Sequence, residues 1–334
     1  MVMNRIRVAW YWCASCGGCE ESFIDLAERL LSILEMVEIV FCPVAIDYKK
    51  SDLEELPDGS IDISFINGGI RLEEHLEMVK LLRRKSRIIV AYGACSYMGG
   101  VPGLANLYDV DEILSLKYLE EPTVVNRERI LPRERTVVEV NGAKVELRLP
   151  RLLDRVYPLN QVIDVEYYIP GCPPTPEVFW NALNKLLGGR APPRGSVLGA
   201  ESRSLCDTCP LNESKPDKIL LRDLKRIVDS MPDGDRCLLA QGYLCLGPVT
   251  RGGCGAKCIN VLMPCTGCFG PLDDITDYGG KAVSYIASII DYDDAEDMER
   301  VYDRIRDWIG IVYKYSLPAS RLRGRIGRRR EVRE

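Results

Sequence analysis

The sequence predicts an α/β fold, in which a parallel sheet carries helices on both faces and a second part with few helices follows. Three observations support this prediction. Short apolar runs alternate with amphipathic, helix-like segments in the first part of the chain. A Gly/Pro-rich segment, GGRAPPRGSVLG, follows the last of these helices, and beyond it loops and cysteines replace the alternation. We therefore predict a flavodoxin-like, doubly wound domain over residues 1–198, a loop-rich domain over 199–316 and a basic tail over 317–334.

Each element is predicted from its local pattern. We expect strands at residues 6–13, 37–44, 61–70, 87–95 and about 165–170, and helices at 22–37, 71–86 and 176–188. The region between 101 and 164 is less regular, with a loop leading into a helix and a hairpin turning at the Asn-Gly pair 141–142. A further helix and its connection are expected at 151–165. Near the end, we expect a loop and helix at 270–290 and one charged helix within 293–318.

Composition limits the kind of protein. The chain has 334 residues, of which 46% are hydrophobic and 28% charged, and these fractions are typical of a globular protein. Its net charge of −5 argues against a general nucleic-acid binder. No apolar run approaches the ~18–20 residues of a membrane span, and no leader pattern is seen, so we expect a cytoplasmic protein. The single histidine, His75, lies in a charged helical pattern and is expected to be solvated, which argues against His-based catalysis.

Cysteines are the most informative residues. The chain has 14 of them, and in a reducing compartment such a number indicates metal or redox work more than disulfides. Eight thiolates make two sets of four, as two [4Fe–4S] clusters require, and the Gly- and Pro-rich loops suit close wrapping around a cluster. Zinc sites and buried free thiols, such as Cys42, are the alternatives. The CxxxC and CxxC spacing followed by Pro271 favours iron–sulfur over zinc. The eight are Cys206, Cys209, Cys237, Cys245, Cys254, Cys258, Cys265 and Cys268.

Four further cysteines follow predicted strands. Cys16 and Cys19 come after the first strand, Cys95 after the fourth and Cys172 after the strand at about 165–170. Because the carboxyl ends of parallel strands meet at one edge of a sheet, these residues are expected to form a third four-thiolate site. Cys13 and Cys16 are a conceivable alternative CxxC pair, but Cys13 is expected to belong to the strand.

Together, CGGCE at 16–20, GACSYMGG at 93–100, PGCPPTP at 170–176 and the eight later cysteines resemble the small subunit of [NiFe] hydrogenases. The chain is most similar to the cytoplasmic F420-non-reducing, or methyl-viologen-reducing, group associated with heterodisulfide reductase. The resemblance implies a non-catalytic subunit whose partner large subunit holds the Ni–Fe centre. It also implies an acceptor reached through an iron–sulfur adaptor and heterodisulfide reductase, or another acceptor subunit.

The resemblance assigns three groups of ligands. The proximal ligands would be Cys16, Cys19, Cys95 and Cys172, the medial ones Cys254, Cys258, Cys265 and Cys268, and the distal ones Cys206, Cys209, Cys237 and Cys245. Two departures from the membrane and periplasmic members matter. CDTC replaces their HxxC pair, and Cys258 adds a fourth medial ligand. We therefore expect three [4Fe–4S] clusters, with a lower-potential medial site than a three-iron cluster would give.

Several alternatives stay open. An iron–sulfur relay subunit of a related complex without hydrogenase activity would show the same cysteines, and a structural zinc protein is the other rival. Glu20 either helps to transfer a proton or orients the partner interface. The alternative is that it is a solvated loop carboxylate. The arginine-rich end is either a solvated tail or a docking segment for an acidic partner. We expect neither nucleic-acid binding nor a direct membrane span.

Overall fold

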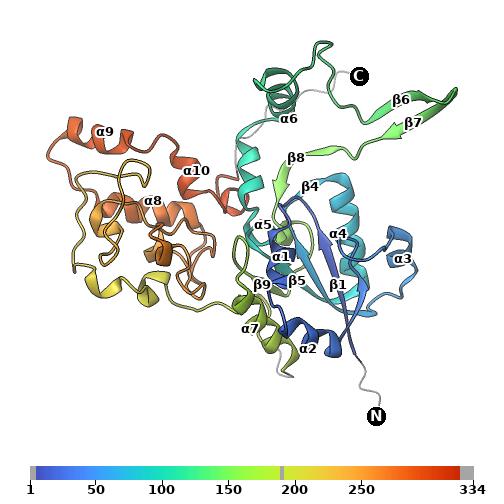
Figure 1. Cartoon of the computed structure of the whole chain (residues 1–334), viewed down its shortest axis with the longest axis horizontal. Helices are drawn as coiled ribbons and strands as arrows, with labels where there is room; N and C mark the ends of the chain where they lie inside the picture. Colours follow the sequence, from blue (N-terminus) through green and yellow to red (C-terminus); the bar gives the residue numbers. More distant parts are fainter. Residues whose placement is uncertain (1–4, 189–191, 324–334) are drawn as a thin grey trace.

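A five-stranded parallel sheet forms the centre of the first part of the molecule (Figure 1). The computed structural model describes residues 5–188 and 192–323. Counted along the chain, the five strands lie in the order 2-1-3-4-5, which is the flavodoxin-like order, so the predicted fold class is confirmed. From one edge to the other they are β2 (Val37–Phe41), β1 (Ile6–Trp12), β3 (Ile61–Asn67), β5 (Ser86–Tyr92) and β9 (Tyr167–Ile169).

Helices cover both faces of this sheet because successive strand residues point to opposite sides. On one face, Phe65 packs with Phe179 of α7 (Pro176–Leu187). On the other, Ile66 packs with Leu82 of α4 (Glu73–Lys85). Helices α1 (Gly18–Ile24) and α2 (Arg29–Met36) lie on the first face, and α3 (Lys50–Glu55) lies on the second.

Three predicted helices differ from the structure. The helix expected at 22–37 is divided into α1 and α2, with Ala27 between them at a left-handed φ of 51°. The helix expected within 293–318 is divided into α9 (Ala295–Asp303) and α10 (Trp308–Val312), because the Asp307 side chain accepts a hydrogen bond from Gly310 N and starts a new helix.

The third, the helix expected at 151–165, was wrong. Residues Leu152–Tyr157 form β8, which pairs antiparallel with β4 (Ile70–Leu72), and only a short turn, η3 (Leu159–Gln161), follows. The Asn106 side chain bonds both the N–H and the carbonyl of Val156, so this strand gains polar partners that its own sequence does not show.

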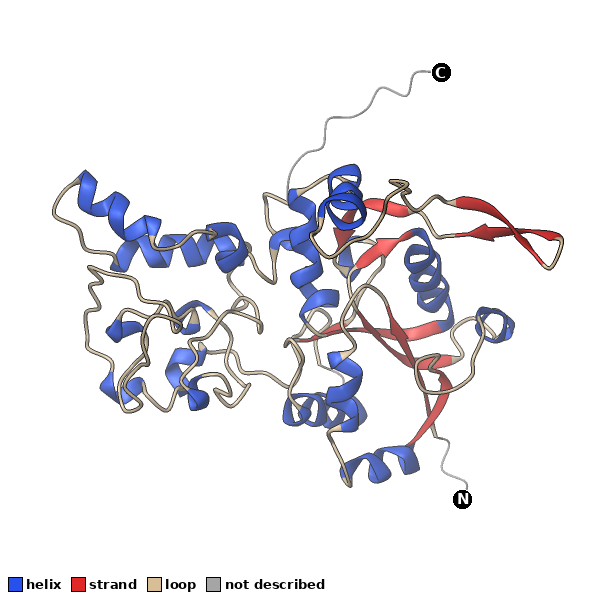
Figure 2. Ribbon diagram, turned by 45° about the horizontal axis from the view of Figure 1, so that its top comes forward, coloured by secondary structure: helices blue, strands red, loops and turns tan. Residues whose placement is uncertain are grey.

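A two-stranded hairpin projects from the body of the molecule (Figures 1 and 2). It consists of β6 (Arg135–Val140) and β7 (Ala143–Arg148), and the predicted turn is confirmed, since Asn141 and Gly142 both have positive φ. The segment before it contains α5 (Ala94–Met98), η1 (Val101–Leu107), α6 (Val110–Ser115) and η2 (Leu116–Glu120).

The C-terminal part consists mostly of loops, as expected. Its longest helix, α8 (Tyr278–Ile289), packs on a hydrophobic cluster that includes Leu238, Leu246 and Ile286. The remaining elements are short 3-10 turns: η4 (Leu205–Thr208), η5 (Asn212–Ser214), η6 (Leu239–Gln241), η7 (Gly247–Val249), η8 (Ile259–Val261) and η9 (Leu317–Ala319). With so little regular backbone, hydrophobic burial and side-chain contacts must hold these loops in place.

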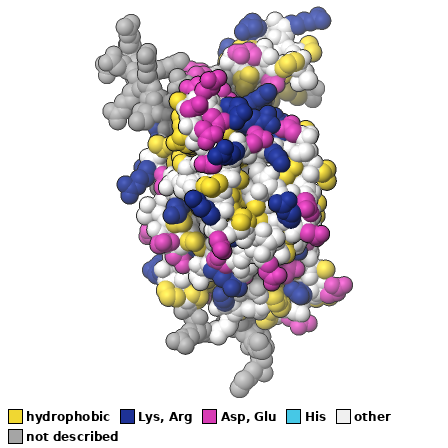
Figure 3. Space-filling model, turned by 90° about the vertical axis from the view of Figure 1, so that its left-hand side faces the viewer, with side chains coloured by type: hydrophobic (Ala, Val, Ile, Leu, Met, Phe, Trp, Pro, Cys, Tyr) yellow, Lys and Arg dark blue, Asp and Glu magenta, His cyan; other side chains and the backbone are white. Residues whose placement is uncertain are grey.

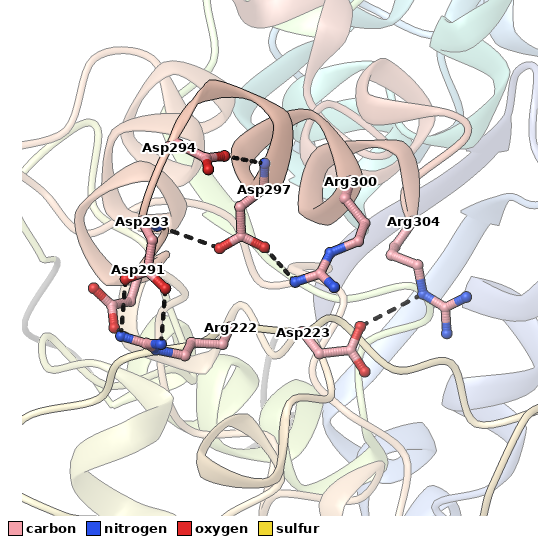
Figure 4. A network of polar contacts seen from close by, with 8 residues as sticks. All are labelled: Arg222, Asp223, Asp291, Asp293, Asp294, Asp297, Arg300 and Arg304. Carbon is pink, nitrogen blue, oxygen red and sulfur yellow. Dashed lines mark hydrogen bonds and ion pairs between the residues drawn. The ribbon is translucent and has the colours of Figure 1, made fainter.

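Ion pairs connect distant loops on the surface of this part (Figure 4). Arg222 pairs with Asp291 and Asp293 at 2.9 and 3.2 Å, and Arg304 lies 3.6 Å from Asp223. Figure 3 shows this end of the molecule with acidic and basic side chains intermixed. Because the pairs are solvent-exposed, each contributes at most about 1 kcal/mol.

The end of the described chain returns to the first part. Pro318 packs so closely against Gly99 and Gly103 that a Cβ on either glycine would lie 2.3 Å from its ring. Tyr315 accepts a hydrogen bond from Gly100 N at 3.0 Å through its carbonyl. The proposed tail boundary at 317 stays a prediction, and residues 324–334 of that tail lie outside the described residues.

Two smaller predictions concern surface properties. In the described part of the chain, no helix combines the length and apolar character needed to cross a membrane. The expectation that His75 is solvated is wrong. Its ring is half-buried and Nδ1 accepts from the N–H groups of Arg71 and Leu72, both at 3.4 Å, while burial lowers its pKa to about 4.

Candidate iron–sulfur sites

The first cysteine group lies at the carboxyl edge of the parallel sheet. Cys19 opens α1 after β1, Cys95 lies in α5 after β5, and Cys172 follows β9. Burial and, to a smaller extent, the nearby thiols of Cys172 and Cys16 together raise the pKa of Cys95 to about 12. The pKa of Cys19 is raised by burial and by all three of the others. The structure thus brings together the four residues that we assign to the proximal site.

Two glycines let the backbone approach these thiols. Gly93 has φ 84° and ψ 163°, and a Cβ there would lie 2.4 Å from Cys19 Sγ. Gly100 has φ 60°, and a Cβ there would lie 2.4 Å from Cys95 Sγ. Both belong to the GACSYMGG motif, so this motif shapes the space around the sulfurs as well as supplying one of them.

Cys13 does not join this group. It is 5% exposed and packs in the hydrophobic cluster on the other face of the sheet from Cys19. Burial, followed by the charge of Glu20, raises its pKa, and none of the proximal thiols contributes. The pairing of Cys16 with Cys19 is therefore favoured over its pairing with Cys13.

The four distal candidates line one cavity in the C-terminal part. Its empty space is about 370 Å³, a figure that includes the open side of the cavity. Apart from the cysteines and Lys215 its walls are apolar or glycine. The lining residues are Cys206, Cys209, Leu211, Lys215, Cys237, Leu238, Leu239, Cys245, Gly247, Pro248 and Ile259.

Hydrogen-bond donors already point at the distal sulfurs. Leu211 N donates to Cys209 Sγ at 3.4 Å, and Cys265 N donates to Cys245 Sγ at 3.3 Å. Lys215 Nζ lies 3.4 Å from Cys206 Sγ. Such donors stabilise thiolate over thiol and are the contacts by which proteins adjust iron–sulfur clusters.

The medial candidates lie between the other two groups. Burial and, to a smaller extent, the thiols of Cys254, Cys172 and Cys258 raise the pKa of Cys268 to about 12. The thiol and the backbone of Cys172, a proximal candidate, lie close enough to Cys268 to act on the pKa of its thiol. Cys265, the fourth medial residue, donates through its N–H to the distal Cys245. The medial candidates therefore neighbour a proximal candidate through Cys268 and a distal candidate through Cys265.

Two tyrosines hold the medial loop. Tyr315 OH lies 3.1 Å from Thr266 Oγ1, and the Tyr278 hydroxyl lies where a Cβ on Gly267 would stand. Tyr278 OH also lies 2.8 Å from Thr250 Oγ1. Sequence reasoning missed these residues because they come from distant segments and have no local motif.

The spacing of the thiols suits a cluster better than one ion. Among residues 5–188 and 192–323, no three His, Cys, Asp or Glu side chains are placed to hold a single metal ion. Four thiolates around one zinc ion at ~2.3 Å must nearly touch, whereas the four irons of a cubane each bind one thiolate and hold the sulfurs further apart. A cavity lined by four thiols, with hydrogen-bond donors directed at their sulfurs, fits the larger group.

Glu20 is neither fully buried nor solvated. Its carboxylate accepts a hydrogen bond from Asn67 Nδ2 at 3.0 Å, and burial raises its pKa above the ordinary value. It lies next to Cys19 in the chain, so it is placed beside the proximal group. The hydrogen bond from Asn67 orients the carboxylate and does not by itself assign it a proton-transfer role.

Comparison with known proteins agrees with this arrangement. Residues 16–186 match the family model described as NADH ubiquinone oxidoreductase, 20 Kd subunit. The chain is 38% identical over 324 residues to the iron–sulfur subunit of the F420-non-reducing hydrogenase of Archaeoglobus profundus, covering 96% of this chain and 99% of that protein. The chain belongs to the iron–sulfur subunit family of F420-non-reducing hydrogenases.

Two further similarities extend this result. The matching subunit of the F420-non-reducing hydrogenase of Methanothermobacter marburgensis is 35% identical over 320 residues, covering 95% of this chain and 96% of that protein. A chain of the recombinant [NiFeSe] hydrogenase from Desulfovibrio vulgaris Hildenborough superposes with a TM-score of 0.51 at 15% identity, covering 82% of this chain and 96% of that one, which shows a shared fold. The protein is therefore a hydrogenase small subunit, a non-catalytic component of an oxidoreductase.

Proposed function

We propose that this subunit relays electrons between the Ni–Fe centre of a partner large subunit and an electron acceptor, through three [4Fe–4S] clusters. The observation that carries the proposal is the series of three four-cysteine groups, in which Cys268 neighbours Cys172 and Cys265 N donates a hydrogen bond to Cys245 Sγ. A bound [4Fe–4S] cluster takes up and releases one electron at a time. The chain itself supplies thiolates, amide donors and burial.

Each group has its own support as a ligand set. Proximal Cys16, Cys19, Cys95 and Cys172 gather at a glycine-shaped sheet edge, distal Cys206, Cys209, Cys237 and Cys245 line one cavity, and medial Cys254, Cys258, Cys265 and Cys268 lie between them. Because burial makes the buried thiols weak acids, cluster binding must displace their protons, which couples cluster assembly to the local fold.

For the acceptor, we propose heterodisulfide reductase reached through an iron–sulfur adaptor, or another acceptor subunit docked near the distal group. The support is membership of the F420-non-reducing family. We also propose a cytoplasmic location, since 14 cysteines with cluster-type spacing suit a compartment that keeps thiols reduced.

The test is metal and spectroscopic analysis of the complex purified anaerobically with its partners. We expect about twelve irons per small subunit, three cubane-type signals in reduced-state EPR, and nickel in the partner. Single serine variants of Cys19, Cys268 and Cys209 should each disturb one signal, whereas Cys13→Ser, as the matched control, should leave all three unchanged.

The outcomes separate the alternatives. Twelve irons without nickel would replace the hydrogenase relay by an iron–sulfur relay in a complex without hydrogenase activity. Zinc in place of iron would refute the proposal, as would loss of one of the three signals in the Cys13→Ser variant.

A further inference from the structure

Lys215 places a positive charge at the distal cysteine group. Its Nζ lies 3.4 Å from Cys206 Sγ, and among the described residues that line this cavity it is the only one with a cationic side chain. No Asp or Glu oxygen lies within ion-pair distance of Lys215 in the described part of the chain. The half-buried ammonium therefore faces sulfur, with no carboxylate to neutralise it.

The backbone around Lys215 is attached to the same site on two sides. Ser214 Oγ accepts a hydrogen bond from Cys237 N at 2.7 Å and donates to the Leu211 carbonyl at 2.7 Å. Lys215 N donates to the Asn212 carbonyl at 3.0 Å, and Leu211 N donates to Cys209 Sγ. The η5 turn is thus built onto distal cysteines, and it holds the lysine in a defined place.

The acidic residue beside Cys206 in the chain, Asp207, acts on the Cys206 thiol in the opposite sense but less strongly than Lys215 does. Asp207 directs its carboxylate at Ser204, accepting from its N–H at 3.0 Å and its Oγ at 2.9 Å. Four thiolates concentrate negative charge in a largely apolar cavity, and adding an electron increases that charge. A nearby cation therefore favours the reduced state.

We propose that Lys215 raises the reduction potential of the distal site. Its ammonium favours the reduced state of the site from which the electron leaves to the acceptor. This inference rests on the proposed function, because it needs a [4Fe–4S] cluster on the four distal cysteines. No bond is made or broken: one electron arrives from the medial side and leaves to the acceptor, and the lysine only shifts the equilibrium.

The experiment is an EPR-monitored redox titration of the anaerobically purified complex. Lys215→Met and Lys215→Gln remove the charge, Lys215→Arg keeps it, and Lys218→Met removes an exposed lysine three residues away. In both neutral variants we expect the distal equilibrium to shift about tenfold toward the oxidised form, which is about 60 mV for one electron. The arginine and Lys218 variants should stay close to the wild-type potential.

The results discriminate clearly. An unchanged distal potential in the neutral variants, with all irons retained, would overturn the inference. Loss of distal iron from the neutral variants would also overturn it, since the lysine would then serve cluster retention. Absence of a distal cubane signal in the wild-type complex would instead refute the proposed function, so the two failures are distinguishable.

Discussion

Replacing Gly93 by alanine tests whether the backbone after β5 is fitted to the proximal thiols. The new Cβ would lie 2.4 Å from Cys19 Sγ, and ordinary contact begins near 3.4 Å, so the sulfur must move by about 1 Å. The residue also has φ 84° and ψ 163°, a region almost confined to glycine, where another residue costs about 1–3 kcal/mol. We expect the variant to lose about four of about twelve irons, because the clash displaces the buried Cys19 thiolate together with the strained backbone that shapes the proximal site.

The assay is iron content per chain together with the proximal EPR signal. Gly195→Ala is the matched control: its φ of 87° imposes similar backbone strain, but nothing lies within 4 Å of an added Cβ. The control should keep its iron. If Gly93→Ala retains all irons and an unchanged proximal signal, the close approach is not part of the site. Equal iron loss in both variants would show that backbone strain alone is responsible.

Three other changes have defined outcomes. Burial alone would raise the pKa of Glu166, but hydrogen bonds from Ile89 N, Arg83 and Arg194 hold it below its ordinary value. The folded pKa is therefore depressed, so this stability is present above about pH 4.5 and is lost as pH falls through the folded value. In urea unfolding, Glu166→Gln should lower the unfolding free energy by about 2 kcal/mol at pH 7. The unfolding free energy of the variant should also depend less on pH in the acid range, and an unchanged pH dependence would contradict this. Arg251 is 3% exposed and donates to the carbonyls of Glu201 and Pro271. Arg251→Met should therefore lower the unfolding free energy by about 3 kcal/mol in the same assay. A loss below about 1 kcal/mol would refute the role of Arg251 in joining these segments. Cys258 is exposed, so Cys258→Ala should remove about one iron, produce a three-iron signal in oxidised-state EPR and leave the fold intact; loss of about four irons would contradict this.

Local patterns predicted most of the sheet because strand and turn signals are short-range. The five parallel strands and the Asn141–Gly142 turn follow from apolar runs and from residues that tolerate positive φ. The prediction was wrong where tertiary partners decide the outcome. Residues 152–157 form a strand because β4 and Asn106 supply its hydrogen bonds, and both lie far away in the sequence.

The cysteine groups also combine features that the sequence predicts with features that only tertiary contacts decide. Cys16 and Cys19 are near Cys95 and Cys172 only because parallel strands end at one edge of the sheet, and this could be predicted once the strand order was assumed. The contact of Lys215 with Cys206 and the proximity of Cys172 to Cys268 have no signature in sequence. They join residues whose neighbourhood depends on how loops fold over a hydrophobic cluster.

Residue order alone was enough to identify the thiols available for cluster chemistry, since cysteine spacing is a local property and four thiolates per cluster is a chemical requirement. Alternating apolar segments were likewise enough to predict the sheet. Three further features depend on packing in three dimensions: Cys13 packs on the other face of the sheet from Cys19, Cys265 N donates to Cys245 Sγ, and Lys215 lies beside Cys206. Electrostatic and hydrogen-bond contacts depend on distance in space, which loop packing sets and local sequence does not encode.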